Sequence, residues 1–310
     1  MAYSKKMPFQ YSSEEMLGVL WRHLFPSREV SLQQRLIELG IDHEINKVEY
    51  AEPRQATIGR SKKDFLVISS WNVRYSSHID DVVQAIEKTP DLANSDVIAL
   101  QEVDTSNRNG RKLPEELAEK TGFGYVHGTE FLLLGHNGVE SNIANMLLSR
   151  HPLTDYEILR LNEGKYFRHN HGRFVGGPMA IKGKIVKDGR EVVVYSTHLE
   201  LKTTPYRRGK QLGEITEATD RYEFKPVIIA GDFNFIFDMI ERPALKLVKG
   251  KGFEDPFGGQ VRSTMNDTIG WILRAALDRI MSRGLRLIDT RIHYEVQCSD
   301  HYPITAVYRL

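Results

Sequence analysis

Short apolar runs separated by polar turns dominate the chain from Phe65 onward. Runs rich in branched and aromatic residues and bounded by turn residues predict β-strands over 65–72, 95–103, 144–149, 177–186, 191–200, 225–234 and 301–310. The segments between them predict helices over 78–88, 113–120 and 206–220. Strands that are apolar almost throughout are buried on both faces. The pattern therefore predicts an α/β protein, a four-layer α/β sandwich of two packed sheets flanked by helices.

Residues 1–64 have a different pattern. A capping signal at Ser12 and Glu15 precedes an apolar helical repeat, and a second signal at Ser31 and Gln34 precedes another. Each signal predicts a short amphipathic helix. We therefore divide the chain into a short helical N-terminal arm, residues 1–64, and one large domain, residues 65–310.

Polar side chains follow several predicted strands at the point where each strand ends. These residues are Asn72, Gln101, Glu102, His198, Glu200, Asp232 and Asn234. In layered α/β proteins, ligands bind at the edge of a sheet where its strands end. We therefore expect these side chains to lie around one cleft.

The residue types at this edge fit the hydrolysis of a phosphate ester. Such a reaction needs a hard cation on the phosphoryl oxygens, an activated water and a protonated leaving group. Carboxylate and amide oxygens suit magnesium or manganese, and imidazole suits proton transfer near neutral pH.

Six short motifs occur in a fixed order beside predicted strands or turns. They are Trp71-Asn72-Val73-Arg74, Gln101-Glu102, Thr197-His198-Leu199-Glu200, Gly231-Asp232-Phe233-Asn234, Leu277-Asp278-Arg279-Ile280 and Ser299-Asp300-His301. Any one of them also fits an ordinary turn or surface position, but the ordered series does not arise from independent turns. Over residues 65–310 the chain resembles the endonuclease/exonuclease/phosphatase superfamily, which has the deoxyribonuclease I-like fold. The resemblance implies a hydrolase that cleaves phosphodiesters with a divalent metal.

The resemblance also implies which residues bind the metal, Mg²⁺ or Mn²⁺. Glu102 matches the family's main metal-binding carboxylate, and Asn72 matches the amide beside it. Asp300 matches an aspartate that lies near the metal. Arg74 stands where some branches carry an acid, so we expect no metal ligand there.

Five further residues match catalytic positions of the family. Asp232 matches the aspartate that orients or deprotonates the attacking water, and Asn234 matches the partner that holds the phosphate. His301 matches the imidazole at the scissile phosphate, and Asp278 the carboxylate that fixes its ring. His198 matches a second imidazole found in the deoxyribonuclease I, sphingomyelinase and tyrosyl-DNA phosphodiesterase branches. A carboxylate on one imidazole nitrogen sets its tautomer, which independently supports the Asp278–His301 pair.

Basic residues near these motifs indicate how an anionic substrate would be held. Arg173 lies in a segment of mixed cationic and aromatic residues, 165–174, and deoxyribonuclease-like enzymes carry a phosphate-contacting arginine in a similar place. Arg207 and Arg208 open the helix that follows the His198 motif. Apurinic-site endonucleases usually carry a tyrosine-containing turn where His198 stands. We therefore expect a nuclease whose substrate is a nucleic acid, DNA or RNA.

Composition narrows these expectations. The chain has 310 residues, 41% of them hydrophobic, and a formal net charge of +1, so a nucleic acid would be gripped by local basic patches. Its one cysteine, Cys298, excludes zinc sites built from several thiolates and indicates a reducing, cytoplasmic compartment. The sequence contains no apolar run long enough to span a membrane, so we expect no membrane anchor.

Three alternatives stay open at this point. The same core serves phospholipid or phosphoinositide headgroup enzymes, and it serves end-processing enzymes such as the tyrosyl-DNA phosphodiesterases. A catalytically inactive binding protein could also use this scaffold, but it would have lost a metal or proton-transfer residue. Every such position is filled here.

Overall fold

The structure is a computed structural model of the chain. It describes residues 45–55, 57–76, 79–106, 112–135, 138–161, 167–169, 174–236, 239–258, 263–266 and 276–310. The two helices predicted within the N-terminal arm lie outside the described residues, and so does Arg173. The predicted boundary at residue 64 stays a prediction.

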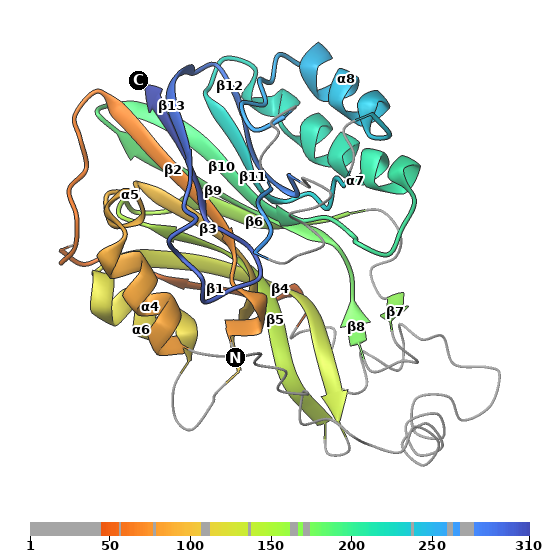
Figure 1. The fold of residues 1–310 in the computed structure, drawn as a ribbon, viewed down its shortest axis with the longest axis horizontal. Coiled ribbons are helices and arrows are strands. Elements are labelled where there is room, and N and C mark those ends of the chain that lie inside the picture. Colours follow the sequence, from red (N-terminus) through yellow and green to blue (C-terminus); the bar gives the residue numbers. More distant parts are fainter. Residues whose placement is uncertain are drawn as a thin grey trace.

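Two β-sheets form the centre of the molecule (Figure 1). The nine-stranded sheet contains β1 (Val48–Ala51), β2 (Phe65–Asn72), β3 (Val97–Asp104), β4 (Gly124–Gly135), β5 (Gly138–Ser149), β7 (Phe167–His169), β8 (Phe174–Gly176), β13 (Arg286–Ile292) and β14 (Ile304–Arg309). Its strand order is β13-β14-β2-β3-β5-β4-β8-β7, with β1 also paired to β4. The five-stranded sheet has the order β12-β11-β10-β9-β6. Its strands are β6 (Thr154–Arg160), β9 (Met179–Lys187), β10 (Arg190–His198), β11 (Val227–Asp232) and β12 (Asp278–Arg283).

Helices cover the outer face of each sheet. One group, α4 (Ile79–Lys88), α5 (Pro90–Ala93) and α6 (Leu113–Thr121), lies on the nine-stranded sheet. The other group, α7 (Pro205–Ala218) and α8 (Arg242–Gly250), lies on the five-stranded sheet. The predicted four-layer α/β sandwich is therefore confirmed. No helix among the described residues is long and apolar enough to cross a membrane.

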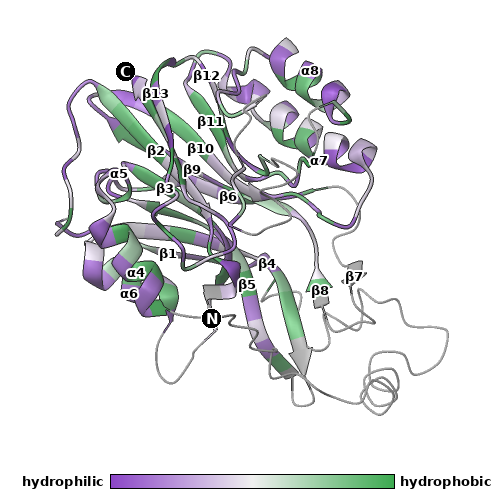
Figure 2. Ribbon diagram, in the orientation of Figure 1, coloured by the Kyte–Doolittle hydropathy of each residue, from purple (hydrophilic) through white to green (hydrophobic). Residues whose placement is uncertain are grey.

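Three apolar clusters explain this layering. The largest lies between the sheets and joins residues such as Leu66, Ile181 and Ile228. The second packs α4, α5 and α6 on the nine-stranded sheet, and the third packs α7 and α8 on the five-stranded sheet. Figure 2 shows the consequence, with hydrophobic strands inside and hydrophilic outer faces on the helices. Strands buried on both faces read as continuous apolar runs, which is why the sequence pattern identified them.

The strand β1 is a feature that the predicted helical arm did not include. Val48 to Ala51 pair with Gly128 to Tyr125 in an antiparallel ladder along β4. An exposed strand edge carries unpaired N–H and C=O groups that another strand satisfies. This part of the arm is therefore a strand of the nine-stranded sheet.

Two parallel strand pairs bring the predicted chemical residues to the same end of the sandwich. In the nine-stranded sheet β2 runs parallel to β3, with Asn72 opposite Gln101. In the five-stranded sheet β10 runs parallel to β11, with His198 opposite Asp232. The ends of both pairs meet, because the Asn72 amide contacts the Asp232 carboxylate across the two sheets.

A buried ion pair joins the sheets at the start of β3, away from this edge. The Asp96 carboxylate accepts hydrogen bonds from the Val67 N–H at 2.9 Å, the Ser61 hydroxyl at 2.6 Å and the Lys187 ammonium at 2.5 Å. His151 Nε2 lies 2.9 Å from the same carboxylate. Burial alone would raise the pKa of Asp96, but these hydrogen bonds outweigh burial and hold the pKa below its usual value.

Asp96→Asn should lower the free energy of unfolding by about 3 kcal/mol at pH 7, because it leaves the buried Lys187 without its counter-charge. The contribution of Asp96 is present above the ordinary aspartate pKa of about 4 and is lost as the pH falls through the lowered folded pKa. Urea unfolding at several pH values tests this. Asp289→Asn on the exposed part of β13 is the control, and equal stability of both variants would contradict the assignment.

Candidate active site

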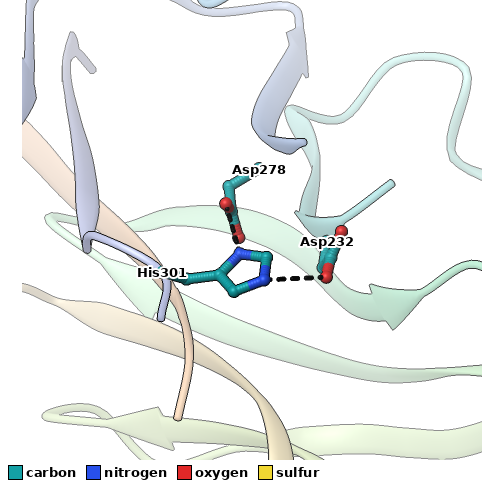
Figure 3. Close-up of side chains that lie close together, drawn as sticks. All are labelled: Asp232, Asp278 and His301. Atoms are coloured by element: carbon teal, nitrogen blue, oxygen red, sulfur yellow. Dashed lines mark hydrogen bonds and ion pairs between the residues drawn. The ribbon is translucent and has the colours of Figure 1, made fainter. Parts of the chain in front are cut away.

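Two histidines face the same aspartate at the edge where the strands end. His198 Nε2 and His301 Nε2 each lie 3.7 Å from Asp232 Oδ2. Asn72 Nδ2 donates to that same oxygen at 3.1 Å. Figure 3 shows Asp232 and Asp278 on two sides of the His301 ring. One carboxylate oxygen therefore accepts a hydrogen bond from Asn72 and forms ion pairs with two histidines.

Each histidine has a second carboxylate on its other nitrogen. His301 Nδ1 lies 2.8 Å from Asp278 Oδ2, and His198 Nδ1 lies 3.2 Å from Glu130 Oε2. Burial would lower the pKa of both imidazoles, but Asp278 and Asp232 raise the pKa of His301 to about 10. Glu130 and Asp232 raise the pKa of His198 to about 10 in the same way. Both rings are therefore held as cations with fixed orientation.

Burial acts on Asp278 in the opposite direction. It raises the pKa of this carboxyl, against the hydrogen bond and charge of His301. The two groups are held as one ion pair in the interior, and Asp278 fixes which nitrogen of His301 faces Asp232.

Strand register sets these positions. His198 on β10, Asp232 on β11 and Asp278 on β12 occupy matching places on three neighbouring strands. Gly231 makes the close pairing possible, because a Cβ there, at φ +152°, would lie 1.8 Å from the Thr197 carbonyl oxygen. We infer that the glycine of the Gly-Asp-Phe-Asn motif is required by packing.

The segment that carries His301 is attached to the end of β2. The Ser299 hydroxyl donates to the Asn72 carbonyl at 2.7 Å, and Trp71 Nε1 donates to the His301 carbonyl at 3.0 Å. These contacts hold His301, which precedes β14 of the nine-stranded sheet, against the strand ends of the five-stranded sheet. Chain positions 230 residues apart therefore meet at one point.

Glu102 offers the best place for a divalent cation. Asn72 Nδ2 donates to Glu102 Oε1 at 3.1 Å, which places the amide beside the carboxylate as predicted. Burial raises the pKa of Glu102, and the positive charges of His198 and His301 only partly oppose it. A half-buried carboxylate whose negative charge is only partly balanced by its neighbours fits a hard cation bound by oxygen ligands. The residues present therefore fit Mg²⁺ or Mn²⁺.

The group of Asp232, Asp278 and His301 also has the compactness of a metal site. Among the described residues, one ligand atom from each lies within 4.8 Å of the others. However, both ring nitrogens of His301 already face carboxylates, and its raised pKa favours the protonated ring. Because a protonated imidazole cannot ligate a metal, this group fits a metal site less well than Glu102 does.

Asp300 lies at the rim of the site. Its Oδ2 is 3.3 Å from the Arg74 guanidinium, and its charge contributes to the raised pKa of His301. The ion pair leaves the other carboxylate oxygen turned toward the Ser299 hydroxyl at 3.4 Å. The role of Asp300 as a metal ligand stays a prediction.

Strained backbone gathers at this edge. Four non-glycine residues near the site have positive φ: Arg74 at 45°, Tyr75 at 57°, Glu102 at 54° and Asn234 at 53°. Glu102 also lies in the irregular register between β3 and β5, where a bulge redirects side chains. Such strain is tolerated where function requires a particular side-chain direction.

Asn234 is fixed by two contacts. Its N–H donates to Asp232 Oδ1 at 2.9 Å, and its Nδ2 donates to the Leu199 carbonyl at 2.8 Å. An amide group has two hydrogens to donate, so one remains for a phosphate oxygen. The structure thus brings Asn234 to the site, and its phosphate contact stays a prediction.

Arg208 is buried, although its predicted role in substrate binding requires an accessible side chain. Only 5% of the residue is exposed, and its guanidinium donates to Glu241 Oε1 at 2.7 and 3.2 Å. Its Nη1 also donates to the carbonyls of Glu200, Leu201 and Thr203. Because these partners use its donors, Arg208 is corrected to a residue that holds the loop after His198. Arg207, by contrast, is exposed, and its role in substrate binding stays a prediction.

Sequence reasoning missed two functional positions. Glu130 orients His198, and Glu241 holds Arg208. Glu130 is only 4% exposed. The available signal for Glu130 was a lone acidic residue within an apolar run on β4, where an unpaired charge would be costly. Glu241 gave no comparable signal, since it stands beside Arg242 in the turn that precedes α8.

Comparison with known proteins agrees with this geometry. The Endonuclease/Exonuclease/phosphatase family matches residues 69–301 of the chain. The chain belongs to this family. Family membership points to a phosphoesterase or nuclease, and enzymes of the family typically use divalent metals. No curated protein sequence matches the chain.

Solved structures of the family share its fold. An endonuclease/exonuclease/phosphatase from Beutenbergia cavernae matches with TM-score 0.59 and 17% identity, over 80% of this chain and 72% of its own. TDP2 of D. rerio complexed with single strand DNA product matches with TM-score 0.55 and 18% identity, over 80% and 100%. The human Nocturnin catalytic domain with bound sulfate matches with TM-score 0.55 and 13% identity, over 84% and 96%. At these identities the matches show the fold alone.

Proposed function

We propose that the protein is a magnesium- or manganese-dependent phosphodiesterase that acts on nucleic acid, a nuclease in the wider sense. The observation that carries this proposal is the arrangement of two carboxylate-bound imidazoles around Asp232, with Glu102 beside them. It supplies a proton acceptor, two cationic donors and an oxygen ligand for a cation in one place. Burying several charges lowers the stability of a protein, so a protein that only binds its ligand would gain nothing from this set.

Asp232 is the group we assign to the attacking water. Its Oδ1 is held by the Asn234 N–H, and its Oδ2 is shared by Asn72, His198 and His301. In this role Asp232 orients the water and accepts its proton as the new P–O bond forms. The neighbouring donors keep the carboxylate in one orientation before the reaction starts.

His198 and His301 are assigned to the phosphoryl group. As protonated rings they donate to its oxygens, where negative charge grows in the transition state. Asp278 and Glu130 keep the rings in position and charged while this happens. One of the two rings then supplies the proton to the leaving oxygen.

Glu102, Asn72 and Asp300 are the residues that would hold the cation. When bound, the cation would neutralise charge on the phosphoryl oxygens and polarise the phosphorus. They would bind it through oxygen atoms, the ligand type that Mg²⁺ and Mn²⁺ prefer.

Nucleic acid is the proposed substrate because anionic groups would meet exposed cations next to the site. Arg207 at the start of α7 follows the loop that begins at His198, and Arg173 keeps its predicted role in phosphate binding. The D. rerio TDP2 structure of the same fold holds a single strand DNA product. The lone cysteine, Cys298, agrees with the proposed cytoplasmic location.

A substrate panel with Mg²⁺ and with excess chelator tests the proposal. It contains single-stranded DNA, duplex DNA, RNA, a DNA end linked to tyrosine, phospholipid vesicles and a small aryl phosphodiester. We expect metal-dependent cleavage of at least one nucleic acid, with affinity falling with salt at a log–log slope of about −2 to −4, since few phosphates are neutralised. If only the phospholipid headgroup were cleaved, the enzyme would be assigned to the lipid branch. If no substrate were hydrolysed, the chain would be assigned as a binding protein.

A further inference from the structure

We propose that the exposed surface at the start of α7 is a base-stacking site for a single-stranded nucleic acid whose scissile phosphate lies at Asp232. We call this surface the α7 shelf and define it as Leu201, Lys202, Tyr206, Arg207 and Lys210. The inference rests on the proposed function and deepens it by naming the strand type and the residue that holds a base.

Tyr206 is the centre of the shelf. It is 71% exposed although it is a large aromatic residue, and the Lys210 ammonium lies 4.8 Å from its ring centroid. The cation orders the ring and leaves the opposite ring face available to a nucleobase. An exposed aromatic ring beside cations is the arrangement that sequence-independent single-strand binders use.

The shelf connects directly to the catalytic residues. The loop from Leu199 begins one residue after His198, and the Leu199 N–H donates to the Asp232 carbonyl at 2.9 Å. The Leu199 carbonyl accepts from Asn234 Nδ2 at 2.8 Å. Thr204, the N-cap of α7, ends this short loop. Tyr206 therefore follows His198 after only eight residues of chain.

The shelf is also rigid. Arg208 holds the carbonyls of Leu201 and Thr203 and pairs with the buried Glu241 before α8. Gln211 holds the Glu200 N–H at 3.2 Å. A rigid shelf loses little conformational entropy when a strand binds, which favours its use as a binding surface.

Charge favours nucleic acid as the occupant. Three exposed cations lie within four residues of Tyr206 along the chain: Lys202, Arg207 and Lys210. The first turn of α7 contains no acidic residue. Glu200, the nearest acid in sequence, shares a hydrogen bond with Gln211. Cations interleaved with one aromatic ring match the alternation of phosphate and base along a strand.

A membrane surface is the other partner that such a patch could meet. Met239 and Ile240 on the neighbouring turn are 74% and 53% exposed and would add apolar area. However, the apolar face of α7, including Leu212 and Ile215, is buried against the five-stranded sheet. An interfacial helix must keep its apolar face free for lipid, so α7 does not have this character.

Binding of an eight-nucleotide single-stranded DNA, followed by fluorescence anisotropy in excess chelator, tests the shelf. Tyr206→Ala should weaken binding by about tenfold, because one stacked base contributes about 1–3 kcal/mol and tenfold corresponds to about 1.4 kcal/mol. Tyr206→Trp should bind at least as well as the natural protein. Phe224→Ala, which removes a 94% exposed aromatic residue beyond the other end of α7, is the matched control and should change nothing.

Two further measurements separate stacking from other causes. An oligonucleotide that lacks bases should bind Tyr206→Ala and the natural protein equally. Lys210→Gln should make the salt slope shallower by about 0.7, whereas Tyr206→Ala should leave that slope unchanged.

The outcomes distinguish the shelf from the proposed function. Equal binding of the DNA by Tyr206→Ala and the natural protein overturns the shelf alone. Failure of the natural protein to bind or cleave any nucleic acid overturns the proposed substrate and the shelf together. Loss of binding to phosphatidylserine vesicles in Tyr206→Ala, with no DNA binding at all, would assign the surface to lipid.

Discussion

Asp278→Asn should lower kcat for a small phosphodiester by about 10³- to 10⁴-fold and leave the protein folded. In serine proteases the same change, at the carboxylate that holds a catalytic histidine, costs about 10⁴-fold because the ring adopts the wrong tautomer. Here the Asp278 carboxylate lies 2.8 Å from His301 Nδ1 and holds the ring with its Nε2 toward Asp232. An asparagine amide in this position keeps the shape and removes the charge that favours the imidazolium.

The measurement is steady-state hydrolysis of the aryl diester at saturating substrate, with urea unfolding on the same samples. Asp96→Asn is the matched control, since it also removes a buried carboxylate but at the start of β3, away from the site. It should lose stability and keep kcat at temperatures where it is folded. If Asp278→Asn retained more than a tenth of the natural kcat, His301 would not depend on Asp278 and the proton-transfer assignment would fall.

The site could be predicted to the extent that its residues lie at strand ends. Asn72, Glu102, His198 and Asp232 all follow apolar runs, and parallel strand pairs bring such ends together. The pattern marks Glu130 only as an acid within an apolar run and could not identify its partner, because His198 is 68 residues away. A contact of that kind depends on how the two sheets pack together, which a local sequence pattern does not show.

Arg208 illustrates the opposite error. Its sequence position among basic residues suggested a solvent-exposed phosphate contact, but the turn at Glu241 packs against it. A basic cluster on a helix contains residues on different faces, and only packing decides which of them meets solvent. Arg207 and Arg208 therefore differ, although they are neighbours of the same chemical type.

Most strands that are buried on both sides could be predicted, although β12 was missed. The missed strands β6 and β13 contain only exposed and partly buried residues and carry several charges, so their sequences resemble polar loops. They lie at the edge of each sheet, where one side meets solvent. The strand β4 was missed for another reason, since its middle contains the charged Glu130 that the site requires.

Glu102→Gln should lower kcat by about 10³-fold at a fixed Mg²⁺ concentration, because several kcal/mol of transition-state stabilisation depend on a cation held by this carboxylate. Excess chelator should abolish hydrolysis by the natural protein. The neutral amide keeps the size of the side chain and its hydrogen bond with Asn72, so the loss reports charge. Added Mg²⁺ or Mn²⁺ should restore part of the activity, as expected for weakened binding.

A readout that does not depend on turnover is the melting temperature with and without the cation. Mg²⁺ binds the folded state of the natural protein and should raise its melting temperature by mass action, and this rise should be absent in Glu102→Gln. Asp104→Asn is the matched control on the same strand, where the carboxylate is bonded to the Ser141 hydroxyl and should not affect the metal. Two results would show that Glu102 holds no catalytic cation. One is full hydrolysis by the natural protein in excess chelator, and the other is an equal rise in melting temperature with Mg²⁺ in the natural protein and in Glu102→Gln. The raised pKa of Glu102 would then report only its partial burial, and the reaction would have to rely on the two histidines alone.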